Sequence, residues 1–404
     1  MTPYKISVIG LLSTGYTASM SIVLLYLANA FLDTASAAEF RFEYNWALTL
    51  SLIFALGWDS AIVRTNKVDA DHLKRFSAFT LPLVSIILSI LNIFIIENNL
   101  VSIFSLTCLL VSVLIFHNHL RHENNFIKYI LGFNVLDKTL RTIVFFSLVL
   151  LFTVHLIDIF TIVYALVFLL SHKFQRKIVL SDFNKFISGL SKYQNIGFLV
   201  AGSYMAFMSK GIYLFNPNLA DGDLIKLDLI LLLASFLFVP IQSIQKFMEM
   251  PAHSPDKQEF HSVFSVKELS KLIAIESLVL FVIIVILNFY SVDIIGQGIS
   301  LQKISELLII TVLLTIFANP IQFLSVNHFY KQIALYVALL FFVVILLNIV
   351  GSYYEQLYVL YVGSVFFASL LILANLSYFS LSFIFFRFFR TVFFVFILIG
   401  LGNA

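Results

Sequence analysis

Long apolar runs separated by short polar segments follow one another along nearly the whole chain of 404 residues. Most runs hold roughly 20 residues, the length that one helix needs to cross the hydrocarbon core of a bilayer. The pattern therefore predicts about twelve or thirteen membrane-spanning helices. The predicted spans are residues 7–30, 40–63, 76–96, 100–120, 129–152, 156–172, 194–215, 225–249, 270–290, 304–326, 331–350, 356–379 and 384–402.

The composition indicates that a membrane, not water, is the main solvent of this chain. Hydrophobic residues make up 60% of the sequence and charged residues 12%. The mean hydropathy is +0.99. Soluble globular domains carry about twice that share of charged residues. The sequence therefore predicts an all-α, polytopic integral membrane protein with very little chain outside the bilayer.

The basic residues are distributed unevenly between the two sides of the predicted helices. With the N-terminus in the cytoplasm, most of the 25 Lys and Arg residues fall in cytoplasmic connections, where short loops usually carry them. The outer connections are short and acidic or neutral, as in residues 216–223. Arg41 is one of the few basic residues that this topology places at the outer end of a span. The sequence thus predicts a multi-pass protein with a cytoplasmic N-terminus.

The longest polar connection, residues 173–193, divides the predicted helices into two groups. Residues 1–172 are expected to form an N-terminal bundle of six helices, and residues 194–379 a C-terminal bundle of six. The cytoplasmic connection itself contains Lys and Arg. Residues 380–404 are expected to add a further hydrophobic helix at the C-terminus.

Few residues outside the helices point to chemistry or to a cofactor. The formal net charge of +3 is too small to indicate nucleic-acid binding, and the single cysteine, Cys108, excludes a disulfide framework. No nucleotide-binding loop or hydrolase motif is present, so we predict no catalytic residue, no metal and no cofactor. His117, His119 and His122 lack an accompanying carboxylate or cysteine set, so we interpret them as an interfacial polar cap.

Asp137, Lys138 and Arg141 lie together inside the fifth predicted span, where each ionisable side chain needs a partner or a function. Asp137 and Arg141 are four residues apart and can pair, while Lys138 and Arg141 share a helical face. One interpretation is a self-neutralising ion pair with Lys138 reaching toward water. The other is a cationic lining for an anionic headgroup, joined by Lys210, because Arg matches phosphate geometry well.

The segment Leu56-Gly57-Trp58-Asp59-Ser60-Ala61-Ile62-Val63-Arg64 closes the second predicted span. It resembles the Leu-Gly-small-Asp-Ser/Thr-Ala-hydrophobic-Arg pattern of Wzx-type polysaccharide (O-antigen) flippases, members of the MATE-like MOP superfamily. Ala38-Glu39-Phe40 and two prolines, Pro240 and Pro320, agree with this resemblance. Two features depart from the family pattern: Asn29 stands where the family has an Arg, and the Gly-Pro before its Glu-Phe is missing.

The resemblance implies two six-helix bundles that move an undecaprenyl-diphosphate-linked oligosaccharide across a bacterial inner membrane by alternating access. The implied partners are this lipid-linked substrate, membrane lipids, and the glycan polymerase and chain-length machinery. Arg64 would join Arg141, Lys138 and Lys210 in binding the diphosphate. Asp59 and Asp137 become candidates for gating or ion coupling. Tyrosines that could stack on sugar rings are Tyr4, Tyr16, Tyr204 and Tyr213.

Other interpretations stay open at the level of the sequence. A membrane-embedded glycan polymerase or ligase would be an enzyme, but such proteins expose a long outer loop with catalytic basic residues, and the outer connections here are short. A MATE-type drug or ion antiporter would need a clear carboxylate site within the membrane. Asp59 and Arg64 also fit a simple helix end with an interfacial anchor. We expect a transporter and not an enzyme.

Overall fold

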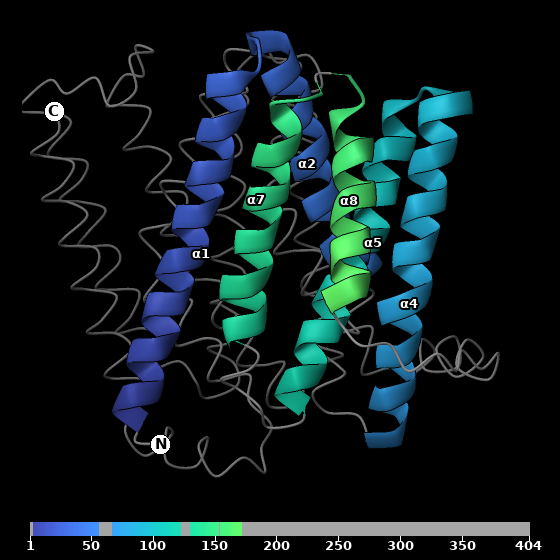
Figure 1. Ribbon diagram of the computed structural model, residues 1–404. Helices are drawn as coiled ribbons and strands as arrows, with labels where there is room; N and C mark the ends of the chain where they lie inside the picture. The colour runs from blue at the N-terminus through green and yellow to red at the C-terminus, as the bar shows by residue number, and fades with distance from the viewer. Residues whose placement is uncertain (1–2, 56–66, 123–129, 153, 172–404) are drawn as a thin grey trace, which may run out of the picture. The chain divides into compact units, whose positions relative to one another are not determined.

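The computed structural model of the protein describes residues 3–55, 67–122, 130–152 and 154–171, and every regular element in these residues is a helix (Figure 1). The elements are α1 (Pro3–Phe31), α2 (Thr34–Phe54), α4 (Lys67–Leu91), the π-helix η1 (Asn92–Ile96), α5 (Asn99–His122), the π-helix η2 (Ile130–Asp137), α7 (Lys138–Val149) and α8 (Leu156–Ser171). From Tyr16 onward they belong to one compact unit, and residues 3–15 fall in a second. The all-helical prediction is confirmed for this part of the chain.

Each of the first six predicted spans overlaps a helix in the described residues, and the span at 40–63 does so through α2 as far as Phe54. The spans at 7–30, 100–120 and 156–172 correspond to α1, α5 and α8 within a few residues. Two spans, 76–96 and 129–152, each combine an α-helix with a π-helix: α4 with η1, and η2 with α7. The later spans, the connection 173–193, the C-terminal bundle 194–379 and the helix at 380–404 lie outside the described residues and stay predictions.

The helix α2 begins before its apolar run because Asp33 caps it. The Asp33 carboxylate accepts hydrogen bonds from the Ser36 backbone N–H at 2.8 Å and from the Ser36 hydroxyl at 3.0 Å. A side-chain oxygen at this position satisfies backbone donors that have no partner within the helix. Residues 34–39, which hydropathy alone assigns to a connection, are therefore helical. The chain turns from α1 into α2 within Leu32 and Asp33.

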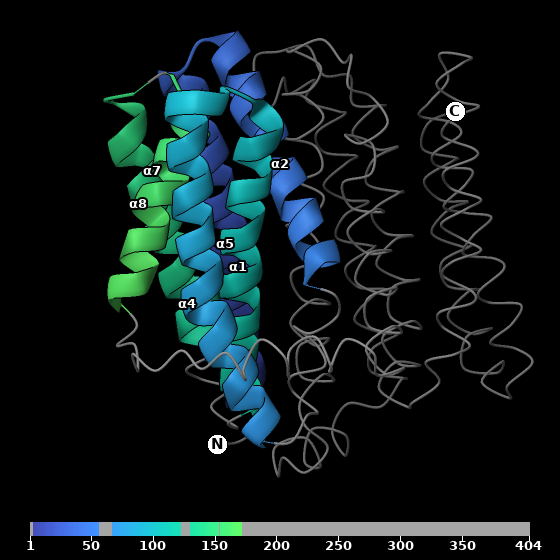
Figure 2. The same cartoon turned by 90° about the vertical axis from the view of Figure 1, so that its right-hand side faces the viewer.

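The described helices pack around a core to which α2, α5, α7 and α8 all contribute (Figures 1 and 2). The most extensive contact joins α4 to α5, and α8 lies against α4, α5 and α7. Phe145 of α7 and Phe160 of α8 are fully buried, with ring centroids 6.3 Å apart. Phe40 of α2 lies against Phe145, with 4.4 Å between ring centroids. These rings bring three helices together at one point of the core.

Small polar residues allow α4 and α5 to approach each other closely. Ser77, Ser85 and Ser89 lie eight and four residues apart along α4, and all three are fully buried. The Ser89 and Ser105 hydroxyls are 2.6 Å apart, and the Ser105 hydroxyl donates to the Ser85 carbonyl at 2.7 Å. Because lipid is as apolar as a helix surface, close packing of small residues and such hydrogen bonds drive helix association in membranes.

The opposite face of α4 is apolar and exposed. Its exposed large side chains include Leu83, Ile87, Ile90 and Leu91. In the described residues, the segments Lys74–Ile96 and Asn99–His119 are long and apolar enough to cross a membrane. A continuous apolar face of this kind suits contact with lipid tails.

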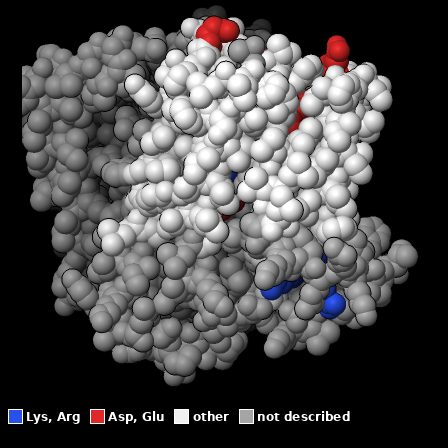
Figure 3. Space-filling view, viewed as in Figure 1, with Lys and Arg blue, Asp and Glu red and all other residues white. Residues whose placement is uncertain are grey.

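Most charged side chains on the visible surface lie toward the two ends of the helices, with a largely uncharged surface between them (Figure 3). At one end, which we call the acidic end, the exposed carboxylates are Asp33, Glu39 and Glu97. At the other, the basic end, α4 carries the half-buried Lys74 and Arg75. The separation places an apolar belt between two polar ends, as a membrane-spanning bundle requires.

Candidate functional site

The predicted pair of Asp137 and Arg141 is present and buried. Asp137 is the last residue of η2, and Arg141 lies in the first turn of α7. The Arg141 guanidinium nitrogen Nη2 is 2.7 Å from the Asp137 carboxylate oxygen Oδ2. Residues four apart on a helix are neighbours, so the local geometry that the sequence indicated does bring these two charges together.

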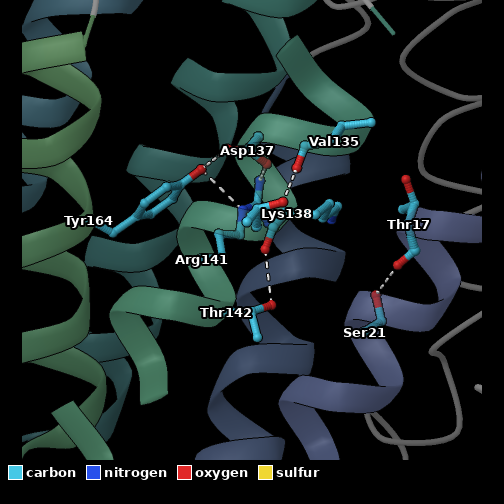
Figure 4. A network of polar contacts seen from close by, with 9 residues as sticks. Thr17, Ser21, Val135, Asp137, Lys138, Arg141, Thr142 and Tyr164 are labelled. Atoms are coloured by element: carbon cyan, nitrogen blue, oxygen red, sulfur yellow. Dashed lines mark hydrogen bonds and ion pairs between the residues drawn. The ribbon is translucent and has the colours of Figure 1, made fainter. Parts of the chain in front are cut away.

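Tyr164 of α8 completes the pair from another helix (Figure 4). Its hydroxyl accepts a hydrogen bond from Arg141 Nε at 3.0 Å and donates one to Asp137 Oδ1. The Arg141 guanidinium carbon lies 5.3 Å from the centroid of the Tyr164 ring. Tyr44 of α2 is a further polar neighbour of the guanidinium. We call Asp137, Arg141 and Tyr164 the ion-pair triad.

The triad is electrically balanced within itself. A buried charge is costly unless it is both paired and hydrogen-bonded, and here each of the two charged groups has both. The triad also fastens α7 to α8, since Tyr164 is buried and reaches both charged groups. In this conformation the Arg141 guanidinium is therefore directed at the Asp137 carboxylate, as the ion-pair interpretation requires.

Lys138 begins α7 beside the triad, where the backbone changes from a π-helix to an α-helix. The lysine is half-buried, and its carbonyl accepts a hydrogen bond from the Thr142 hydroxyl at 3.0 Å (Figure 4). One residue later, the Thr139 hydroxyl lies 2.6 Å from the Tyr16 hydroxyl of α1. π-helical segments are often found at functional sites, so the triad stands at a point where the backbone is unusual.

Several predicted residues cannot be placed in this site. Asp59, Arg64 and Lys210 lie outside the described residues. His117 and His119 are buried in α5, and their interpretation as an interfacial polar cap stays a prediction. Among the described residues, no group of three or more His, Cys, Asp or Glu side chains is arranged to hold a metal ion.

Comparison with solved structures defines the fold of the whole chain, although no protein-family model and no curated protein matches it. An outward-facing multidrug resistance MATE family transporter of the MOP superfamily matches with a TM-score of 0.58 over 97% of each chain, at 12% identity. A MOP superfamily transporter from Pyrococcus furiosus matches with a TM-score of 0.55, at 14% identity. This match covers 92% of the present chain and 94% of the other, whose binding pocket is described as having reverse polarity. A MATE protein in complex with MaL6 gives a TM-score of 0.58 over 96% of each chain, at 12% identity.

The chain has the fold of the MATE-type transporters of the MOP superfamily. Because the match covers nearly the full length, the prediction of an all-α, polytopic membrane protein is confirmed. The MATE-like part of the sequence resemblance is confirmed at the level of fold. The Wzx-type subfamily is a finer assignment that these structures do not address.

Within this MATE-type fold, the sequence interpretation missed three buried ionisable residues. Arg41, expected at the outer end of a span, is 0% exposed, and its Nη2 donates to the Asn29 side-chain oxygen at 2.8 Å. Asn29 is the residue that stands where the Wzx pattern has an Arg, so Arg41 contacts that position. Glu43 of α2 and Asp158 of α8 are also buried. Both fall inside predicted spans, and an ionisable residue within an apolar run was the signal that could have found them.

Proposed function

We propose that the protein is a flippase that carries an undecaprenyl-diphosphate-linked oligosaccharide from the cytoplasmic to the outer leaflet of a bacterial inner membrane. The likeness to MATE-type transporters along nearly the whole chain supports transport by this fold. The resemblance of residues 56–64 to Wzx-type flippases supports the lipid-linked glycan as cargo. The observation that carries the proposal is the buried guanidinium of Arg141, a side chain whose geometry matches a diphosphate.

In this proposal, the substrate engages Arg141 by taking the place of its present partner in the triad. Removing the anion from a buried Arg costs about 3–5 kcal/mol, so the guanidinium exchanges partners more easily than it loses one. An incoming diphosphate replaces the Asp137 carboxylate on Arg141, and the released Asp137 turns toward the neighbouring Lys138. Asp137 then acts as a gate that keeps the cationic site closed until the substrate anion arrives.

The remaining predicted residues complete this cycle in the proposal. Lys210 and Arg64 add positive charge for the diphosphate, and Asp59 joins a gate on the cytoplasmic side. The bundles at 1–172 and 194–379 rock about a hydrated cavity while the lipid tail stays in the bilayer. The glycan polymerase and chain-length machinery would receive the flipped substrate on the outer side.

Flipping of an undecaprenyl-diphosphate-linked sugar by full-length protein in reconstituted vesicles tests the proposal. We expect Arg141→Gln to lower the flipping rate at least tenfold. The double variant Asp137→Asn with Arg141→Gln contains no uncompensated charge, so it separates loss of a substrate contact from loss of folding. It should insert normally and still fail to flip. Arg75→Gln, which removes a positive charge from the basic end, is the matched control and should keep the wild-type rate.

Two results would overturn this assignment. A double variant that flips the substrate at the wild-type rate would limit the triad to a structural role. A wild-type protein that leaves the lipid-linked sugar in place but exchanges a drug for an ion in the same vesicles would be an antiporter. The antiporter is the second candidate because one structural neighbour is named a multidrug resistance transporter.

A further inference from the structure

Three buried polar side chains form a closed set of hydrogen bonds where η1, α5 and α8 meet. Asn92 Nδ2 and the Ser102 hydroxyl each donate to Asp158 Oδ2 at 2.8 Å, and Asn92 Nδ2 also donates to the Ser102 hydroxyl oxygen at 2.8 Å. None of the three residues is more than 4% exposed. We call them the Asp158 cluster. They take no part in the proposed binding of the diphosphate.

Asn92 extends the cluster to the backbone of the turn before α5. Its Oδ1 accepts the Asn98 N–H at 2.9 Å, and its carbonyl accepts the Glu97 N–H at 3.0 Å. Glu97 has a φ of 50°, in the left-handed region that residues with a side chain seldom adopt. Such a conformation persists where its surroundings hold it. Asn92 therefore fixes this turn and the Asp158 carboxylate together.

The connection before α8 shows the same backbone feature. His155, three residues before Asp158, has a φ of 52°, and its carbonyl accepts the Ile159 N–H at 3.0 Å. Within the described residues, Glu97 and His155 are the non-glycine residues with a positive φ. Both therefore lie next to the Asp158 cluster in the sequence, and the cluster holds the start of α8 at a defined place against η1 and α5.

The helix α8 links this cluster to the ion-pair triad. Asp158 and Tyr164 are six residues apart, which places them about 9 Å apart along the helix axis and about 120° apart around it. Between them, Phe160 is fully buried, and its ring stacks on that of Tyr164 with centroids 5.8 Å apart. Asp158 is bonded to η1 and α5, whereas Tyr164 is bonded to Asp137 and Arg141. Two anchors on different sides of one helix fix both its depth and its rotation.

We propose that Asp158 is a positioning residue for the triad. By holding the first turn of α8, it sets where the Tyr164 hydroxyl meets Arg141 and Asp137. The hydrogen bonds that Asp158 accepts do this, because Asn92 and Ser102 are neutral donors. The consequence for transport rests on the proposed function: Tyr164 holds Asp137 in place, so the cluster sets how readily the substrate anion displaces Asp137 from Arg141.

A fluorine atom on the Tyr164 ring, introduced as fluorotyrosine into the full-length protein, tests the positioning whatever the cargo. Its NMR resonance reports the surroundings of the ring. Asp158→Ala removes the acceptor and should shift the resonance by more than its line width. Asp158→Asn keeps one side-chain oxygen for the same two donors and should leave the resonance close to that of the wild type. Ser102→Ala, which removes a single donor, should give a smaller shift in the direction of Asp158→Ala.

Ser89→Ala is the matched control, because the buried Ser89 hydroxyl bonds Ser105 between α4 and α5 and makes no bond to α8. It should lower the midpoint of thermal unfolding, Tm, about as much as Ser102→Ala does, yet leave the resonance in place. If Asp158→Ala fails to fold, Ser102→Ala carries the test. The proposal is overturned by a resonance that stays in place in Ser102→Ala, by an equal shift in Ser89→Ala, or by an Asp158→Asn shift as large as that of Asp158→Ala.

Flipping kinetics test the consequence for transport separately. Asp158→Ala and Tyr164→Phe should each lower the half-saturating concentration, KM, of the undecaprenyl-diphosphate-linked sugar by about fivefold, the equivalent of one hydrogen bond. Because Asp158 acts through Tyr164, the double variant should have the KM of Tyr164→Phe alone. A double variant in which the two effects multiply contradicts this coupling. A wild type that does not flip the substrate refutes the proposed function and leaves the fluorine resonance as the test of Asp158.

Discussion

The ion-pair triad should behave as one energetic unit. Asp137→Asn leaves the buried Arg141 guanidinium without a counter-charge, and Arg141→Gln leaves the Asp137 carboxylate in the same condition. Each single change should destabilise the protein by about 3–5 kcal/mol. The double variant contains two neutral amides at the same positions, so its cost should fall below the sum of the single costs by about 3 kcal/mol.

Tyr164 allows the contribution of the bridging hydroxyl to be measured separately. Tyr164→Phe keeps the aromatic ring over the guanidinium but removes two hydrogen bonds to charged groups. Hydrogen bonds to charged groups contribute about 1.5–3 kcal/mol each, so we expect the loss of two to cost at least about 3 kcal/mol. Tyr26→Phe is the matched control, because Tyr26 is exposed and its hydroxyl should contribute little.

Equilibrium unfolding of the full-length variants in mixed detergent micelles would supply these free energies. The double-mutant cycle is decisive, because it subtracts effects that each change has on the rest of the molecule. If the costs of Asp137→Asn and Arg141→Gln add to within about 0.5 kcal/mol, the two side chains do not stabilise each other, and the reasoning from burial and distance is wrong.

Two further predictions concern the helix start at Asp33 and the contact between α4 and α5. Hydrogen bonds from Ser36 lower the pKa of the Asp33 carboxyl in the folded protein. The carboxylate therefore contributes its full stabilisation above the pKa that Asp33 has in the unfolded chain. This stabilisation disappears as the pH falls through the lower pKa of the folded state. Wild-type Tm should therefore fall below about pH 4 more steeply than that of Asp33→Asn, and equal slopes would contradict the cap. Ser105→Ala should destabilise the protein by about 0.6 kcal/mol and at most about 1.7, measured by the same unfolding assay. Ser147→Ala, at an exposed serine that bonds only its own helix, should change nothing.

The features that the sequence predicted correctly depend on residues close together along the chain. An apolar run of about 20 residues is sufficient to indicate a spanning helix, and each of the first six predicted spans overlaps a helix in the described residues. The Asp137–Arg141 pair follows from a separation of four residues. Capping by Asp33 is equally local, but hydropathy does not register a polar cap, so the start of α2 was predicted too late.

The features that were missed depend on which helices are neighbours. Tyr164 lies 23 residues from Arg141, and Asn92 lies 66 residues from Asp158. In a membrane protein, the lipid-facing and buried sides of a helix are both apolar, so the sequence pattern gives little information about which side faces a partner. Arg41 shows the consequence, because its position near a helix end suggested exposure, whereas it is fully buried and donates a hydrogen bond to Asn29 of α1.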